Sequence, residues 1–192
     1  IEAFREYQKQ QAWVWEHQAL TRARFVAGDP RVGEDFEKIR KEVLCQKRNL
    51  TDLKNEILIM RKKMLDSHPN TTQLFDIKHD RGGIIDVEFI VQYLVLGYSY
   101  KHSALTNNIG NIGLLKLSGE LGLISKSSAE EVLEAYREFR RVQHRLRLNT
   151  DSTQSDNPST KNSQQKFARI EISYLEKARS SVLQLWGEIL GE

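Results

Sequence analysis

Apolar residues recur three and four positions apart along most of this chain, which is the spacing of amphipathic helices. Proline occurs only 3 times in 192 residues, so little interrupts such helices. The pattern predicts one extended segment, at 71–81, and helices over 1–27, 32–46, 51–65, 84–98, 107–121, 128–148 and 165–190. We therefore expect an all-α fold, an antiparallel bundle of six to seven helices.

The segment 84–98 differs from the others because its apolar residues surround the helix axis. A helix of 15 residues with apolar residues on every side is typical of the centre of a bundle. It is too short to cross a membrane, and the chain has no run of about 18 apolar residues that could do so. We expect this helix to be the central one.

Several residues predict where helices begin and end. Gly28-Asp29-Pro30 separates the first helix from the second, since glycine favours a helix end and proline a helix start. Thr51 or Asp52 is the expected cap of the third helix. Ser128 and Glu131 have the spacing of a capping box for the helix 128–148.

The first helix, 1–27, has an apolar arc that includes Trp15 and also contains Glu16. We expect Trp15 to lie in the core, where its replacement by alanine would cost about 3 to 5 kcal/mol.

The domain organisation follows from these segments. We expect a single helical domain over 1–192, with a core bundle at 1–148, a polar linker at 149–165 and a C-terminal helix at 166–190. The chain begins at Ile1 without a methionine, which suggests a fragment of a longer protein.

Composition excludes some functions. A net charge of +3 from 29 basic and 26 acidic side chains disfavours a general polyanion binder, so we expect neither nucleic-acid nor membrane partners. A single cysteine fits a reducing, cytoplasmic location. A weaker alternative is an RNA-binding module on the basic cluster Arg140, Arg141, Arg145 and Arg147, although an ordinary solvated stripe explains that cluster as well.

Acidic residues in apolar surroundings are the first candidates for chemistry. Asp86 and Glu88 on the central helix point about 200° apart, so they do not share a metal ion. Glu16 and Glu88 need partners if they are buried, and the available bases are Arg22, Arg24, Lys78 and Arg81. A buried ion pair that fixes helix register is favoured over a catalytic role. The histidines lack metal-site spacing, so no metal ligand and no catalytic residue is predicted.

Basic residues suggest anion contacts. Arg22 and Arg24, near the end of the first helix, could reach a phosphate, or could simply favour the negative end of the helix dipole. Gly82-Gly83, preceded by Lys78, could form an anion-binding turn. It lacks a complete phosphate-loop pattern, so a packing turn is the favoured interpretation.

Two segments resemble one known family. Residues 12–24 read AWVWEHQALTRAR and are followed by VAGD, which resembles the WEHQAL-x-RAR-x-VAGD segment of bacterial glutamine synthetase adenylyltransferases. Residues 76–94 read DIKHDRGGIIDVEFIVQYL, which resembles that family's K-x-x-x-GG-I-x-D-[IV]-E-F-x-V-Q-x-L segment. Trp15, Glu16, Gly82, Gly83, Asp86 and Glu88 belong to these motifs, and the resemblance covers residues 4–148.

The resemblance implies a bifunctional enzyme of two similar halves, each a nucleotidyltransferase domain followed by a helical domain related to that of the PII uridylyltransferases. One half removes AMP from glutamine synthetase, and the other attaches it from ATP. His17 and Gln18 match the motif form of the adenylylating, C-terminal half. The implied partners are glutamine synthetase, the PII signal protein and the adjoining nucleotidyltransferase domain.

The family's Asp-x-Asp pair, which would hold magnesium for phosphoryl transfer, does not occur in these 192 residues,. We therefore expect this fragment to bind neither ATP nor magnesium on its own, and to complete or regulate an active site located elsewhere. Arg22, Arg24 and, less strongly, Lys78 are the candidates for nucleotide or partner contact. The alternative is a regulatory module that docks the PII signal protein or senses glutamine.

Overall fold

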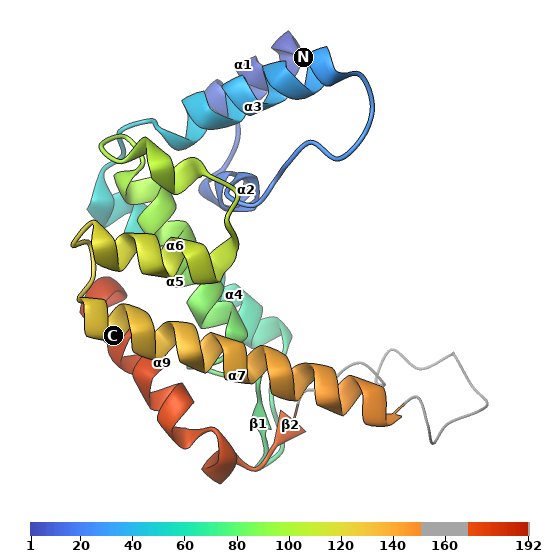
Figure 1. Cartoon of the computed structure of the whole chain (residues 1–192), viewed down its shortest axis with the longest axis vertical. Coiled ribbons are helices and arrows are strands. Elements are labelled where there is room, and N and C mark those ends of the chain that lie inside the picture. Colours follow the sequence, from blue (N-terminus) through green and yellow to red (C-terminus); the bar gives the residue numbers. More distant parts are fainter. Residues whose placement is uncertain (151–168, 192) are drawn as a thin grey trace.

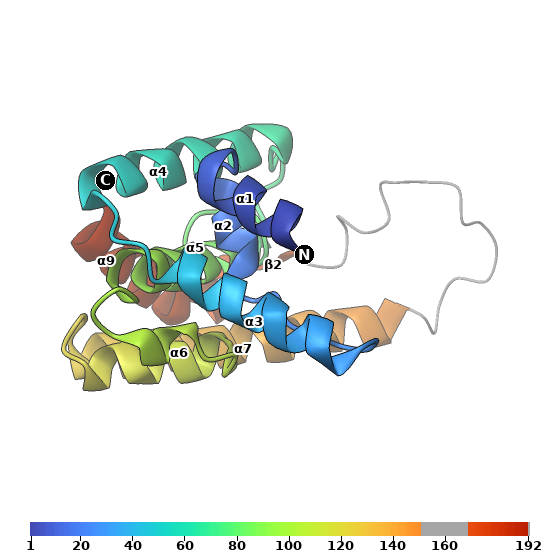
Figure 2. The same cartoon turned by 90° about the horizontal axis from the view of Figure 1, so that it is seen from above.

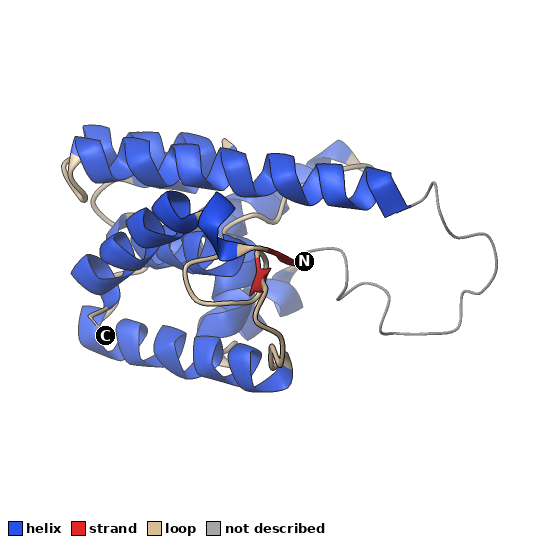
Figure 3. Cartoon of the chain, turned by 90° about the horizontal axis from the view of Figure 1, so that it is seen from below, coloured by secondary structure: helices blue, strands red, loops and turns tan. Residues whose placement is uncertain are grey.

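The protein is a bundle of helices arranged around one central helix (Figure 1). The computed structural model describes residues 1–150 and 169–191. Its longer helices are α1 (Glu2–Gln10), α2 (Val14–Leu20), α3 (Pro30–Leu44), α4 (Leu50–Ser67), α5 (Ile84–Tyr98), α6 (Gly110–Glu120), α7 (Lys126–Thr150) and α9 (Glu176–Leu190). The expected all-α fold is confirmed, and strands in the described residues are limited to one short ribbon (Figure 3).

Helix α5 is the central helix, as its apolar sequence predicts. It packs against α2, α4, α6, α7 and α9, and Figure 2 shows it between α4 on one side and α6 with α7 on the other. Val87, Ile90 and Leu96 are fully buried. The bounds of α5 coincide with the predicted 84–98, because each of its sides meets another helix and the apolar residues all have partners.

The ribbon consists of β1 (Phe75–Asp76) and β2 (Arg169–Ile170), paired antiparallel with Phe75 opposite Ile170. The extended segment expected at 71–81 is therefore confirmed only at β1. Two short 3-10 helices, η1 (Ser103–Thr106) and η2 (Ile172–Tyr174), precede α6 and α9.

The prediction of one helix over 1–27 is wrong. The chain breaks after Gln10, continues as α2 and leaves the helical conformation after Thr21. At the end of α2, the guanidinium of Arg40 on α3 donates to the carbonyl oxygens of Leu20 and Thr21, at 2.9 Å each. The Leu20 carbonyl also accepts the Ala23 N–H at 3.2 Å in a turn, so this turn and the contact with Arg40 together mark the end of a helix that local propensity would continue.

Trp15 does not lie in the core, contrary to prediction. Its side chain is 50% exposed, and that of Trp13 is 66% exposed. With the helix broken at 11–13, the apolar arc expected for residues 12–27 no longer forms one face. The core contribution from α2 comes instead from Leu20, which is 6% exposed. The stability loss expected for a buried tryptophan therefore does not apply to Trp15.

Helix starts are shifted by short distances. Asp29 caps α3 by accepting from the Arg31 N–H at 2.9 Å, with Pro30 at the first helical position, as the Asp-Pro pair predicts. Asn49 caps α4 in place of Thr51 or Asp52. Ser125 accepts from the Ser128 N–H at 2.9 Å, so α7 begins before the predicted capping box.

The C-terminal helix is shorter than expected, because β2 and η2 occupy residues 169–174. Val182, Leu185, Trp186 and Leu190 of α9 belong to the same apolar core as α5, so α9 is packed into the bundle. Most of the polar linker expected at 149–165 lies outside the described residues.

Among the described residues, none of the helices has both the length and the apolar character needed to cross a membrane.

Candidate functional site

The first motif segment, formed by α2 and the turn after it, is joined to α5 by two side-chain pairs. Gln18 Nε2 donates to Gln92 Oε1 at 2.8 Å, and both side chains are buried. One turn away, Arg22 Nη1 lies 3.4 Å from Glu88 Oε2. Gln18 and Arg22 are four residues apart, as are Glu88 and Gln92, so the two faces run antiparallel. Of the four bases expected to answer Glu16 and Glu88, Arg22 is the one that pairs with Glu88.

Glu88 is paired with Arg22, and its charge acts on Tyr136 of α7. We call Arg22, Glu88, Asn111, Tyr136 and Arg140 the Glu88 cluster. Asn111 Nδ2 on α6 donates to the Tyr136 hydroxyl on α7 at 3.0 Å. Burial raises the pKa of Tyr136, as does the charge of Glu88, while the Asn111 hydrogen bond and the charges of Arg140 and Arg22 oppose the rise. The cluster therefore combines a phenol, a carboxylate and two guanidinium groups.

The Arg22 guanidinium is the most accessible part of the motif junction. Its side chain is 68% exposed, whereas that of Glu88 is 22% exposed. An ion pair this exposed contributes at most about 1 kcal/mol to stability. Arg22 is thus held near Glu88 while its guanidinium is open to an anionic group from outside the chain.

Two other basic candidates stand apart from this cluster. Arg24 and Lys78 are exposed, and their side chains form no hydrogen bond or ion pair within the part of the chain that the structure describes. Lys78 uses its backbone N–H, which donates to Asp76 Oδ1 at 2.9 Å. Geometry therefore favours Arg22 over both as the residue fixed in place by the fold.

Within residues 1–150 and 169–191, Glu16 has no basic partner, which corrects the expectation of an ion pair. Its carboxylate accepts from the Trp13 N–H at 2.8 Å and from the Tyr7 hydroxyl at 2.7 Å. These two bonds cap the start of α2 and attach it to α1. The backbone hydrogen bond and then the Tyr7 bond lower the pKa of Glu16, so it stays ionised as a structural cap.

The Gly82-Gly83 turn is a packing turn and not an open anion site. The N–H of Gly82 donates to Asp86 Oδ2, that of Gly83 to the Asp80 carbonyl at 3.1 Å, and that of Ile84 to the Ile77 carbonyl at 2.8 Å. A Cβ atom at Gly82 would lie 2.6 Å from Arg179 Cγ, so α9 covers the turn. The N–H groups that an anion would need are already used.

Asp86 forms a buried ion pair with Arg61 of α4, a partner that the sequence analysis missed. Both side chains are almost fully buried, and Arg61 also donates to the His79 carbonyl at 2.7 Å. The signal was available, because Arg61 follows the buried Ile57 by one helical turn on the apolar side of α4. This pair ties α4 to the glycine turn and the start of α5.

His17 is a buried histidine whose role is structural. Its Nε2 lies 2.9 Å from the Gln8 carbonyl and its Nδ1 lies 3.4 Å from Arg48 Nη2. A neutral ring that donates from Nε2 and accepts at Nδ1 satisfies both contacts. Burial lowers the pKa of His17, and it also lowers the pKa of Arg48 to about 10.

This lowered pKa predicts acid sensitivity. Below the ordinary histidine pKa near 6.5, the unfolded chain binds a proton that the folded chain does not. The free energy of unfolding therefore decreases as the pH is lowered from about 6.5 to the lower pKa that His17 has in the folded chain. We expect this histidine to contribute a slope of up to about 1.4 kcal/mol per pH unit. Urea unfolding from pH 7.5 to 5 measures it, and His17→Gln should flatten the dependence; an unchanged slope in that variant would contradict this assignment.

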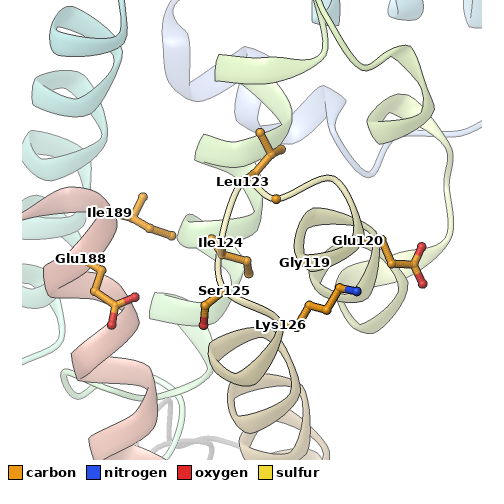
Figure 4. Close-up of a pocket in the computed structure, with 9 residues that line it drawn as sticks. Gly119, Glu120, Leu123, Ile124, Ser125, Lys126, Glu188 and Ile189 are labelled. Atoms are coloured by element: carbon orange, nitrogen blue, oxygen red, sulfur yellow. The ribbon is translucent and has the colours of Figure 1, made fainter.

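We also searched the described residues for a metal site and for a binding pocket. No group of three His, Cys, Asp or Glu side chains among residues 1–150 and 169–191 could hold a metal ion. A pocket of about 590 Å³ opens between the turn at the start of α7 and helix α9 (Figure 4). Its charged side chains, Glu120, Lys126 and Glu188, are exposed; none is the buried, fixed polar group that a specific site requires.

Two family models match this chain, and each match contains one of the two motif segments. A family model described as glutamate-ammonia ligase adenylyltransferase matches residues 1–39, and one described as GlnD PII-uridylyltransferase matches residues 54–184. The chain is similar over its whole length to proteins named bifunctional glutamine synthetase adenylyltransferase/adenylyl-removing enzyme. It is 62% identical to that of Nitrosomonas europaea and 61% identical to that of Nitrosomonas eutropha, each over 191 residues.

The corresponding protein of Bordetella bronchiseptica is 46% identical over 190 residues, which is 99% of this chain. The chain spans about a fifth of the length of these relatives, 21% of each Nitrosomonas protein and 19% of the Bordetella protein. The second family model covers well over half of the chain. The chain therefore belongs to the GlnD PII-uridylyltransferase domain family, in the form found in bifunctional glutamine synthetase adenylyltransferase/adenylyl-removing enzymes.

Proposed function

We propose that this chain is a helical segment of a parent enzyme that attaches AMP from ATP to glutamine synthetase and, through another part, removes it. The observation that carries the proposal is the 62% identity over the whole chain to an enzyme with that name. The parent would hold ATP and magnesium in its nucleotidyltransferase domain and act in the cytoplasm. The chain contains no Asp-x-Asp pair, so we expect no AMP transfer by this segment alone.

The role of the segment would be to complete the active site of the adjoining domain through Arg22. A guanidinium is suited to phosphate contact because its planar N–H groups match phosphate oxygens and its charge persists at every physiological pH. Glu88 limits where that guanidinium can lie, which reduces the entropy lost on binding. Arg24 and Lys78 remain candidates without such a fixed position.

The test is AMP incorporation into glutamine synthetase by the parent enzyme carrying Arg24→Ala or Arg22→Ala. Arg24→Ala should lower the rate without changing the unfolding temperature, because its side chain is exposed and forms no hydrogen bond or ion pair within the described residues. Lys177→Ala, an exposed cation on α9, is the matched control and should leave the rate unchanged. An undiminished rate in Arg24→Ala would remove that residue from the site.

A second candidate function is favoured by the match of residues 54–184 to a PII-uridylyltransferase model. In this alternative, the segment docks the PII signal protein or senses glutamine and transmits that state to the catalytic domain. Calorimetric titration of the chain with PII, with and without glutamine and nucleotide effectors, separates the two. Measurable heat of binding supports the regulatory module, and its absence in folded protein supports the active-site role.

A further inference from the structure

Exposed apolar side chains are concentrated at the N-terminal end of this protein. Of the thirteen large hydrophobic side chains that are exposed in the described residues, seven lie within residues 1–39, a fifth of the chain. Trp13 and Trp15 are the largest of them, at 66% and 50% exposure, and Val26 is 82% exposed. Tryptophan is the residue most enriched in the energetic centres of protein interfaces, so such a concentration indicates a contact surface.

The two tryptophans stand on a fixed part of the fold. The Trp13 N–H is bonded to Glu16, whose carboxylate also accepts from Tyr7 on α1. Further along α2, Gln18 is bonded to Gln92 on α5, and Arg40 holds the Leu20 carbonyl. Both ends of α2 are therefore anchored. The exposure of the indoles belongs to a preorganised surface and not to a frayed terminus.

The family comparison indicates what covers this surface. Residues 1–39 match the adenylyltransferase model, whereas residues 54–184 match the PII-uridylyltransferase model. About four-fifths of the length of the relatives lies outside this chain. Helices α1 and α2 and the start of α3 thus lie in the part of the chain that is similar to an adenylyltransferase.

We propose that the exposed apolar side chains of residues 1–39, of which Trp13 and Trp15 are the largest, dock an adenylyltransferase domain of the parent enzyme that lies outside this chain. This proposal rests on the proposed function and specifies which face meets the catalytic domain. Arg22 follows the end of α2 by two residues, so the docked segment leads directly to the residue proposed for phosphate contact.

Hydroxyl-radical footprinting of the parent enzyme and of this chain tests the proposal, with oxidation read at individual side chains by mass spectrometry. In this chain alone, Trp13 and Trp15 should oxidise readily and Trp186, which is 2% exposed, slowly. In the parent, oxidation of Trp13 and Trp15 should fall at least roughly fivefold, as expected for the centre of a water-excluding interface. Tyr174, 80% exposed and outside the surface, is the internal reference and should change by less than about twofold.

Two results would overturn the proposal. One is equal oxidation of Trp13 and Trp15 in the parent and in this chain. The other is protection that develops in this chain alone as its concentration is raised roughly a hundredfold, since a second copy would then be the occupant. The footprint measures oxidation and requires no AMP transfer. A negative footprint therefore leaves the activity test of Arg22 and Arg24 unaffected, and a negative activity test leaves the footprint interpretable.

Discussion

Replacing Asp86 with alanine is expected to lower the free energy of unfolding by about 3 to 5 kcal/mol, the cost of leaving a buried charge without its partner. Arg61 would keep its guanidinium in the interior, where its side chain is 3% exposed. The Gly82 N–H would also lose its acceptor. Chemical denaturation of this chain measures the change.

Two controls make this prediction specific. Asp66→Ala removes an exposed carboxylate from the same helix as Arg61 and should change stability by about 0.5 kcal/mol or less. The double variant Arg61→Met with Asp86→Leu removes both charges and should lose less than Asp86→Ala alone. A loss under about 1 kcal/mol for Asp86→Ala would show that the pair does not secure the glycine turn.

The second large effect is expected for Gly83→Ala, about 2 to 4 kcal/mol of lost stability. A Cβ atom at Gly83 would overlap the Ile77 carbonyl oxygen and lie 3.0 Å from that of Asp80. These oxygens accept the N–H groups of Ile84 and Gly83, so relief of the overlap would break hydrogen bonds at the start of α5.

Gly122→Ala is the matched control, because a side chain at Gly122 would meet backbone strain but no neighbouring atom, whereas one at Gly83 would meet neighbouring atoms but no backbone strain. Gly122 has φ of +69° but no atom within 4 Å of its Cβ position, so only left-handed backbone strain of about 1 kcal/mol applies. Gly83 has the ordinary φ of −93° and no room. Equal losses in the two variants would contradict the steric argument.

The central helix and the start of α3 could be predicted from sequence because their signals are local. Ile84 to Tyr98 are apolar on all sides, and Asp29-Pro30 is a strong start signal. The first helix could not be bounded in this way. The break in this helix depends on Glu16, which caps the start of α2. It also depends on Arg40, twenty residues from Leu20, which donates to the carbonyl groups at the end of α2.

The candidate site was predicted in part for the same reason. A basic partner for Glu88 could be predicted because few bases lie near the apolar faces, but the choice of Arg22 among Arg22, Arg24, Lys78 and Arg81 came from the structure. Tyr136 and Asn111 join the cluster through the packing of α6 and α7 against α5, and no periodicity in the sequence reveals that meeting. The position of Trp15 could not be predicted from its place in an apolar arc. Such an arc indicates burial, but it does not distinguish a core within this chain from an interface with another domain.

We propose that Arg22 contributes to AMP transfer beyond its role in the fold. The most direct measurement is the rate of AMP incorporation into glutamine synthetase by the parent enzyme with Arg22→Ala, at saturating ATP and glutamine synthetase, together with its thermal unfolding. We predict a rate at least roughly tenfold lower, equivalent to about 1.4 kcal/mol in the transition state, with unfolding changed by no more than an exposed ion pair allows. An unchanged rate in a normally folded variant would contradict the account.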